Sequence, residues 1–240
     1  MAKPRFYHAQ LTGDESTVSL TTEEVRHVGA ARRLAEGDQI LLMNGRGGVA
    51  EAEIRVLDKR RCEVALLAWE QSALPKQRRS IATAVPKPDR QRFMVEALVQ
   101  LGVTELVPLN CQRSITQGDH KSLSKWPRYA IEAIKQSGNP WLPEIRHGTD
   151  LHTLLEQSKS GGAVTRLFAD VDSQGDIQFD ANAAERLLLI GPEGGFTDAE
   201  REDLLSNGFA PLRLAGPILR TEVAAIVGAA RLLHASEADD

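Results

Sequence analysis

The sequence predicts an α/β protein of two domains, in which a small β-barrel precedes a larger domain built on a parallel sheet. In roughly the first 70 residues, several short apolar strands surround one helix, a pattern typical of a small barrel. After a polar linker, strands alternate with helices, which indicates a parallel sheet with crossover helices. We therefore expect residues 1–72 to form the barrel and residues 73–240 to form the α/β domain.

The composition excludes several classes of protein. Of the 240 residues, 42% are hydrophobic and 26% are charged, so the chain can build a packed core and is not expected to be disordered. No apolar run approaches the roughly 18 residues that span a bilayer, so no membrane association is expected. Cys62 and Cys111 lack the spacing of a metal site, and no cluster of His, Asp or Glu suggests one. The N-terminal residues MAKPRFYHAQ lack the apolar core of a secretory signal, so the cytoplasm is the expected location.

The net charge of −4 is distributed unevenly along the chain. Residues 76–150 carry 12 Lys or Arg and 7 Asp or Glu. Residues 151–240, in contrast, carry 7 Lys or Arg and 15 Asp or Glu. A basic segment in an acidic chain is compatible with a local surface for a polyanion. Ordinary solvated charge is the simpler interpretation, and charge alone favours it.

Turn residues and alternating apolar positions define the elements of the predicted barrel. A helix is expected to begin at Thr21 and to continue to Leu34. A hairpin is expected at residues 44–48, because Asn44-Gly45 is a strong signal for a tight turn. The strands are expected at residues 5–9, 39–43, 49–57 and 62–69.

Residues 70–79 are polar and contain a proline, so we interpret them as the linker. Beyond it, apolar residues at helical spacing predict helices, and short apolar runs predict buried strands. Thr197 and Glu200 form a predicted capping box, and Thr221 is expected to cap the final helix. Further helices are expected up to Leu101 and at residues 126–137 and 151–157. The strands are expected at residues 81–85, 103–108, 167–170, 186–190 and 211–215.

One loop, at residues 189–197, follows a buried strand and precedes a capped helix. In open α/β sheets, ligands bind beyond the carboxyl ends of the strands. Gly191, Gly194 and Gly195 permit positive φ and close approach of the backbone to a ligand. The loop lacks the order of a dinucleotide or phosphate loop, and Glu193 would repel a phosphate, so an uncharged or cationic group fits better. A tight turn without a ligand is an equally good interpretation of this loop alone.

A second loop, at residues 214–222, also follows a strand and precedes a helix. Ile218 and Leu219 are apolar where a solvated loop would be polar, so we expect a flat apolar ligand or another part of the chain to cover them. Glu222 suits the positive end of the helix dipole, whereas Arg220 does not, which favours a functional role for Arg220.

At these two loops the sequence resembles a known family. Leu-Ile-Gly-Pro-Glu-Gly-Gly-Phe at residues 189–196 and Leu-Arg-Thr-Glu at residues 219–222 look like the knotted, SPOUT-type methyltransferases. Specifically, they resemble the enzymes that methylate ring nitrogen 3 of a uridine in small-subunit ribosomal RNA. The resemblance extends over nearly the whole chain, although Pro217 and Lys135 depart from the residues usual in the family. The other matching segments are 4–7, 27–33, 37–38, 44–45, 87–90, 101–103, 113–114, 136–138 and 143–145.

The resemblance implies a trefoil knot in the C-terminal domain, a PUA-like RNA-binding barrel before it, and a homodimer with the active site near the subunit interface. It also implies S-adenosylmethionine as the cofactor, held by the two loops and by the end of the strand at residues 167–170. A cationic sulfonium agrees with a loop that bears Glu193 rather than lysine. The implied cofactor-binding residues are Leu167, Ala169, Leu189, Ile190, Gly191, Gly194, Gly195, Leu214, Gly216, Ile218 and Leu219.

The implied reaction is direct methyl transfer to a uridine that is extruded into a dry pocket. Arg220 would stabilise negative charge on the pyrimidine carbonyls. Glu222 would orient Arg220 or would only cap the helix. The implied partner is small-subunit ribosomal RNA or the assembled small subunit. Its phosphates would be contacted by four arginines, each of which could instead form a simple surface ion pair, namely Arg5, Arg33, Arg90 and Arg113.

Three other residues admit a functional and a structural interpretation. His27 matches a family position, yet a structural histidine is the simpler interpretation. Trp126 and Trp141 could stack on bases, but packing in a core or an interface is simpler.

Two other functions stay open at this point. One is an RNA-binding ribosome-assembly factor that kept the fold and lost the chemistry, which the departures at Pro217 and Lys135 favour. It would bind RNA without transferring methyl groups. The other is a nucleotide-using metabolic enzyme with an accessory barrel, whose RNA affinity would be weak and sensitive to salt.

Overall fold

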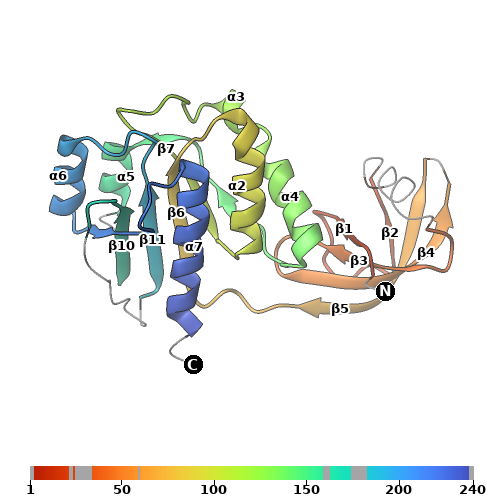
Figure 1. The fold of residues 1–240 in the computed structure, drawn as a ribbon. Helices are drawn as coiled ribbons and strands as arrows, with labels where there is room; N and C mark the ends of the chain where they lie inside the picture. The colour runs from red at the N-terminus through yellow and green to blue at the C-terminus, as the bar shows by residue number, and fades with distance from the viewer. Residues whose placement is uncertain are drawn as a thin grey trace. The chain divides into compact units, whose positions relative to one another are not determined.

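The computed structural model describes residues 3–21, 24, 34–58, 60–158, 163–173 and 183–237. The chain forms two compact units (Figure 1). The first contains Met1–Leu74 and Ile131–Leu142, and the second contains Pro75–Ala130 and Pro143–Asp240. The expected boundary between residues 72 and 73 stays a prediction. Within the described residues, no helix is both long enough and apolar enough to cross a membrane.

The first unit is built on a five-stranded sheet with the order β1-β3-β4-β5-β2. β1 runs parallel to β3, and the other neighbours are antiparallel. Alternate side chains of these strands point inward, and Ile40, Leu42, Ile54 and Val64 are completely buried in the core. The strands are β1 (Arg5–Tyr7), β2 (Thr17–Ser19), β3 (Gln39–Met43), β4 (Gly48–Leu57) and β5 (Cys62–Gln71). The helix expected from Thr21 to Leu34 lies outside the described residues, apart from its two ends and Glu24.

The predicted hairpin at residues 44–48 is confirmed, and it joins β3 to β4. The Asn44 Oδ1 atom accepts hydrogen bonds from the backbone N–H groups of Arg46 (2.7 Å) and Gly48 (2.9 Å), which fixes the turn. Gly47 has φ +86°, and a Cβ atom there would lie 2.4 Å from the Trp141 ring. Trp141 therefore packs on this hairpin within the first unit, in agreement with the structural interpretation of that residue.

The second unit contains a seven-stranded sheet whose paired strands all run parallel. The order is β12-β10-β11-β6-β7-β8, and β9 also pairs with β7. The strands are β6 (Arg78–Ala84), β7 (Glu105–Asn110), β8 (Glu144–Ile145), β9 (Thr149–Asp150), β10 (Val164–Ala169), β11 (Glu185–Ile190) and β12 (Ala210–Leu212). The helices are α2 (Pro88–Gln100), α3 (His120–Leu123), α4 (Trp126–Ser137), α5 (Leu151–Ser158), α6 (Asp198–Ser206) and α7 (Thr221–Glu237). The first five residues of α4 belong to this unit and the remainder of the helix to the first.

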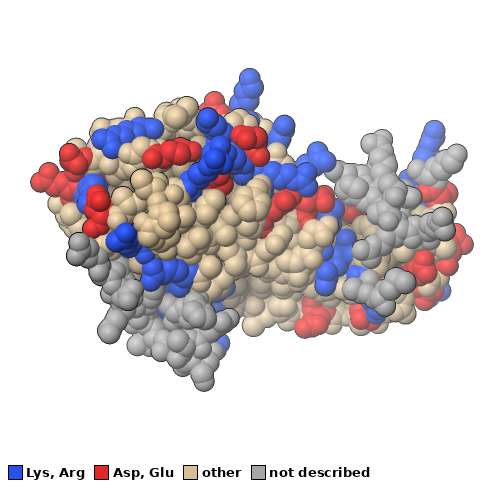
Figure 2. Space-filling model, in the orientation of Figure 1, with Lys and Arg blue, Asp and Glu red and all other residues tan. Residues whose placement is uncertain are grey.

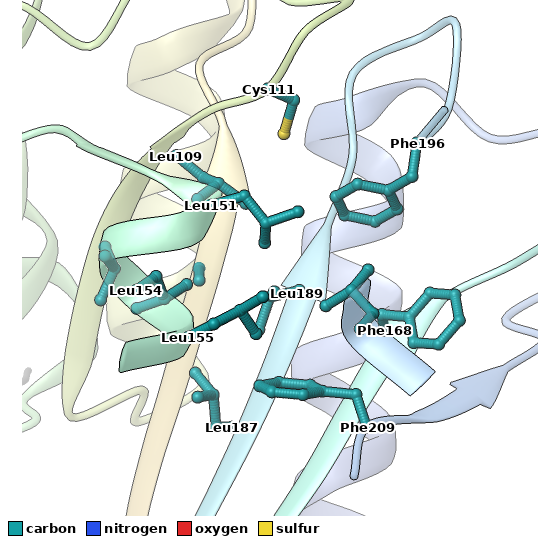
Figure 3. Packing of buried hydrophobic residues seen from close by; sticks show 13 residues of the cluster. Leu109, Cys111, Leu151, Leu154, Leu155, Phe168, Leu187, Leu189, Phe196 and Phe209 are labelled. Atoms are coloured by element: carbon teal, nitrogen blue, oxygen red, sulfur yellow. The ribbon is translucent and has the colours of Figure 1, made fainter. Parts of the chain in front are cut away.

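Alternation along β11 directs its side chains to the two faces of the sheet. Leu187 and Leu189 join a core that includes one face of α5 and the ring of Phe168 (Figure 3). Leu188 and Ile190 point to the opposite face, where a Cβ at Gly228 of α7 would lie 2.4 Å from Leu188 and 3.6 Å from Ile190. Both faces of β11 are therefore covered, as the continuous apolar run of this strand predicts.

The order of the strands brings the two glycine-bearing loops together. β12 lies at the edge of the sheet, but α7, which follows it, packs on β6, β11 and α2 (Figure 1). The chain must therefore return from the edge to the middle of the sheet between residues 213 and 220. On this return it meets the loop after β11, where the Thr221 hydroxyl donates a hydrogen bond to the Gly191 carbonyl (3.4 Å).

Several expected bounds were wrong, because the strands expected at residues 5–9, 103–108 and 211–215 are Arg5–Tyr7, Glu105–Asn110 and Ala210–Leu212. Two further differences concern the linker and the start of the last helix. The predicted linker at residues 70–79 is shorter, because β5 continues to Gln71 and β6 begins at Arg78, where residues 78–83 pair in parallel with β11. Thr221 is the first residue of α7 instead of its cap, and the Arg220 carbonyl accepts the hydrogen bond from Ala224 N (2.8 Å). The Thr221 side chain is thereby free to bond to the loop after β11. The predicted capping box at the start of α6 is confirmed.

Candidate functional site

A cavity of about 480 Å³ opens at the carboxyl ends of β10 and β11, within the range usual for small-molecule sites. Three segments of the second unit form most of its wall. They are residues 168–172 after β10, residues 190–196 after β11, and residues 214–219 before α7. The cavity thus lies where parallel α/β sheets bind their ligands, and the two loops singled out from the sequence both border it.

The loop after β11 is held in one conformation by contacts at both of its ends. Gly195 donates a backbone hydrogen bond to the Pro192 carbonyl (2.8 Å) and has φ +69°, a conformation that favours glycine. Phe196 is buried and packs edge-to-face on Phe168, with ring centroids 6.0 Å apart. Arg113, from the segment after β7, donates hydrogen bonds to the carbonyls of Gly194 (2.7 Å) and Phe196 (3.4 Å). These contacts fix the loop before any ligand binds.

The loop before α7 is held by Arg213, which donates hydrogen bonds to the carbonyls of Ala215 (3.2 Å) and Gly216 (3.3 Å). Its apolar side chains border the cavity. Ile218 is 79% exposed, so no described part of the chain covers it. Cover of this side chain by a ligand stays a prediction.

Most of the predicted cofactor-binding residues border the cavity, and three do not. Leu167 and Leu189 are buried on opposite faces of the sheet, before the last residues of their strands. Gly216 is exposed, and its carbonyl faces Arg213. The residues that border the cavity are Ala169, Ile190, Gly191, Gly194, Gly195, Leu214, Ile218 and Leu219. Cofactor binding by all of them stays a prediction.

The predicted catalytic residues lie in different surroundings. Arg220 is exposed, although it is only one residue from Thr221, which borders the cavity. Glu222 is buried, and its Oε1 atom lies 3.6 Å from Arg90 Nε. Among the described residues, none provides a hydrogen bond to its Oε2 atom. Glu222 thus contacts Arg90 of α2.

The three described arginines that were predicted to contact RNA are divided between the two units. Arg33 lies outside the described residues. Arg5 belongs to the first unit and donates a long hydrogen bond to the Gln136 carbonyl (3.5 Å). Arg90 and Arg113 both belong to the second unit and contact the loop after β11, Arg90 through Glu193 (3.9 Å) and Arg113 through the carbonyls described above. RNA contact by these residues stays a prediction.

Sequence reasoning missed an ion pair in the wall of the cavity. Asp170, just after β10, is buried, and its Oδ1 atom lies 2.7 Å from Arg201 Nη1 of α6. Asp172 also borders the cavity and lies 3.8 Å from the same guanidinium. The position of Asp170 at a strand end is a weak signal in the sequence, and nothing there connects it to Arg201.

Cys111 lies in the core, next to the buried capping residue Glu200. Burial, and secondarily the charge of Glu200, raises the pKa of the Cys111 thiol to about 12, although a hydrogen bond with Ser114 opposes the shift. The thiol is therefore protonated at neutral pH, and Cys111 is a packing residue.

Trp126 is completely buried, and its Nε1–H donates a hydrogen bond to Gln91 (3.0 Å), so it is a core residue. Within the described ranges, no three His, Cys, Asp or Glu side chains are grouped to hold a metal ion.

Comparison with known families defines the class of protein. A model described as RNA methyltransferase domain matches residues 73–233, and a model described as RNA methyltransferase PUA domain matches residues 20–67. The chain belongs to the RNA methyltransferase family. The fold class expected from the sequence, a knotted parallel α/β domain preceded by a PUA-like domain, is confirmed.

Curated relatives of the chain share one name, ribosomal RNA small subunit methyltransferase E. The protein from Bacillus subtilis is 29% identical over 234 residues, which cover 92% of this chain and 91% of the relative. The protein from Synechocystis is 30% identical over 224 residues, which cover 91% of this chain and 73% of the relative.

Solved structures are similar over nearly the whole chain. Ribosomal RNA small subunit methyltransferase E from Neisseria gonorrhoeae, bound to S-adenosyl methionine, has a TM-score of 0.87 at 28% identity and covers 97% of this chain and 98% of its own. A probable rRNA-methyltransferase from Porphyromonas gingivalis has a TM-score of 0.84 at 32% identity, and the match covers 98% of this chain and 99% of that chain.

Proposed function

We propose that this chain uses S-adenosylmethionine to methylate small-subunit ribosomal RNA, and that the methyl group goes to ring nitrogen 3 of a uridine. The observation that supports the proposal most directly is the cavity between the two loops at the carboxyl edge of the sheet. The Neisseria relative is described as bound to S-adenosyl methionine, and its fold matches this chain over nearly its full length.

The chemistry of the cavity fits this cofactor. Phe168, Ile190 and Ile218 provide apolar surface for a flat adenine ring, and the glycine loop exposes backbone groups to the ligand. Glu193 and Asp172 supply negative charge near a cationic ligand. Of the two arginines in the wall, Arg201 is paired with the Asp170 carboxylate, whereas Arg113 donates a hydrogen bond to the uncharged Gly194 carbonyl.

When bound, S-adenosylmethionine supplies a methyl group on a positively charged sulfur. The chain's own contribution is to hold the uracil ring so that its nitrogen 3 and the methyl carbon are in line. The N–C bond forms as the C–S bond breaks, and the ring proton passes to solvent. Arg220, exposed beside the cavity, offers a guanidinium to the uracil carbonyls as the ring loses its proton.

RNA is the proposed partner, as free ribosomal RNA or as an assembled small subunit, and we propose that the protein acts as a homodimer. The chain is acidic overall, and acidic and basic side chains are interspersed on the face shown in Figure 2. Such a surface favours a structured RNA target over nonspecific attraction to any polyanion, because phosphate attraction supplies most nonspecific affinity.

The alternative of an assembly factor without methyltransferase activity rests on two positions, 135 and 217, where the sequence departs from the residues usual in the family. The two residues lie in different parts of the structure. Lys135 belongs to the first unit, where its ammonium pairs with Glu132 (3.0 Å) and Glu24 (3.2 Å). The presence of lysine at this position therefore affects ion pairs within the first unit. Pro217 borders the cavity, so it is the departure that bears on chemistry.

A methyl-transfer assay tests the proposal. The full chain is incubated with small ribosomal subunits that lack the modification and with S-adenosylmethionine labelled in its methyl group, and the nucleosides are then separated by mass. The proposal predicts labelled 3-methyluridine at one position. Label in another nucleoside would contradict the site of transfer, and RNA binding with no label would support the assembly factor. Absence of S-adenosylmethionine binding would leave the metabolic enzyme as the better account.

A further inference from the structure

The resemblance assigned Arg90 to a phosphate of the RNA, but its surroundings indicate another role. We propose that Arg90 is a positioning residue that ties the two cofactor loops together through one guanidinium. The inference rests on the proposed function, because it takes the cavity between these loops as the S-adenosylmethionine site.

The geometry places Arg90 between the two loops. It is the third residue of α2, and its side chain is 25% exposed. Its Nε atom lies 3.6 Å from the Glu222 carboxylate, at the start of α7 directly after the second loop. Its Nη1 atom lies 3.9 Å from the carboxylate of Glu193, in the first loop. One side chain from a third element therefore contacts the first loop and the helix start that directly follows the second loop, through different nitrogens.

The contact matters because the positive charge of Arg90 compensates the negative charge of the buried Glu222 carboxylate. The Glu222 side chain is only 5% exposed, and a buried carboxylate is strongly unfavourable unless a cation lies beside it. Arg90 supplies that positive charge and shares it with Glu193. Lysine could not replace it fully, because a single ammonium lacks the fork of nitrogens that reaches two carboxylates.

Loss of Arg90 would leave Glu193 and Glu222 without the cation that they share. We expect their repulsion to move the two loops apart and to weaken cofactor binding, while RNA affinity changes little. A residue that contacts a phosphate would behave in the opposite way. Its loss would weaken RNA binding without changing cofactor affinity. It would also lower, by about one unit, the slope of the logarithm of the RNA-binding constant against the logarithm of the salt concentration.

The test measures both affinities in the full chain. S-adenosylmethionine binding is followed by calorimetry, and binding to small-subunit RNA is measured at several salt concentrations. The variants are Arg90→Gln and Arg90→Lys. The control is Arg92→Gln, on the same helix, where the arginine pairs with Glu96 (2.7 Å) and its guanidinium lies 5.9 Å from the Tyr129 ring.

We expect the cofactor dissociation constant to rise about tenfold in Arg90→Gln and about threefold in Arg90→Lys, as for residues that share one ion network. It should stay within twofold of the original chain in Arg92→Gln. The salt slope for RNA should be the same in Arg90→Gln as in the original chain. Under saturating cofactor, Arg90→Lys should recover most of kcat while KM for the cofactor stays raised, which a general loss of stability would not produce.

Two results would overturn the inference. One is cofactor affinity in Arg90→Gln within twofold of the original chain. The other is a loss of RNA affinity with a smaller salt slope. If thermal melting shows that Arg90→Gln does not fold, the Arg90→Lys variant provides the test. Unchanged cofactor affinity in Arg90→Lys would then reject the proposed positioning role of Arg90. Failure of the unaltered chain to bind S-adenosylmethionine would refute the proposed function instead, so the two failures are distinguishable.

Discussion

Arg220 and Glu222 flank the same threonine, yet one is exposed and the other is buried. The exposed guanidinium is available to a substrate, whereas the carboxylate contacts Arg90 from within the protein. A role in the chemistry therefore fits Arg220 better than it fits Glu222.

Arg220→Ala should lower the rate of methyl transfer at least about a hundredfold, the scale for loss of one group that stabilises developing charge. S-adenosylmethionine affinity should not change, because Arg220 is not among the residues that border the cavity. Single-turnover transfer and calorimetry measure the two quantities. Unchanged turnover in this variant would remove Arg220 from the chemistry.

Cys111 gives a prediction that depends on pH. Its pKa is raised from 9.0 to about 12, mainly by burial, so the folded chain holds the thiol proton where the unfolded chain releases it. Its contribution to the free energy of unfolding is therefore complete below about pH 9 and is lost as the pH rises toward 12, by at most about 1.4 kcal/mol per pH unit.

The measurement compares urea unfolding of the original chain and of Cys111→Ala at pH 8.5 and at pH 10.5, values chosen on either side of the ordinary thiol pKa of roughly 9. The original chain should lose more stability between the two than the variant does. Equal losses would show that the thiol is not protected from ionisation.

At the scale of the elements, the loop after β11 depends on the backbone conformation of one glycine. Gly195 has φ +69°, and no atom lies within 4 Å of where its Cβ would be, so the only penalty for alanine is conformational. Gly195→Ala should lower the free energy of unfolding by about 1 kcal/mol. Gly216, in the other loop, also has open space around its Cβ position but no positive φ, so Gly216→Ala serves as the matched control and should cause little change. Chemical denaturation compares the two, and equal effects would contradict this account of the loop.

Elements with a strong local pattern could be predicted from the sequence, and elements that depend on distant pairing could not. The helix at Trp126–Ser137 was predicted at its observed bounds, because its apolar residues recur at helical spacing. The strands β8 and β9 have two residues each, and only their pairing with β7 defines them. No alternation can develop in so few residues, so they were missed.

The candidate site shows the same division. Glycines and a capping box mark the loop after β11 in the sequence, and its position beyond a buried strand was predicted correctly. The contacts between Asp170 and Arg201, and between Arg90 and Glu222, join elements far apart in the sequence, with no motif to relate them. Only the return of the chain from β12 to the middle of the sheet places Arg90 and Glu222 next to each other.

At the scale of the whole molecule, the chain forms two units, each with its own core. The cavity belongs wholly to the second unit. Its wall comes from three segments that the topology of one sheet brings to a common edge. The central claim is therefore that this edge binds S-adenosylmethionine.

Crystals of the full chain grown with S-adenosylmethionine test that claim most directly. The account predicts electron density for the cofactor in the cavity, with the adenine between Ile218 and the strand ends and with polar contacts to the backbone at Gly191 and Leu214. Density for the cofactor anywhere else on the molecule, with this cavity empty, would contradict the account.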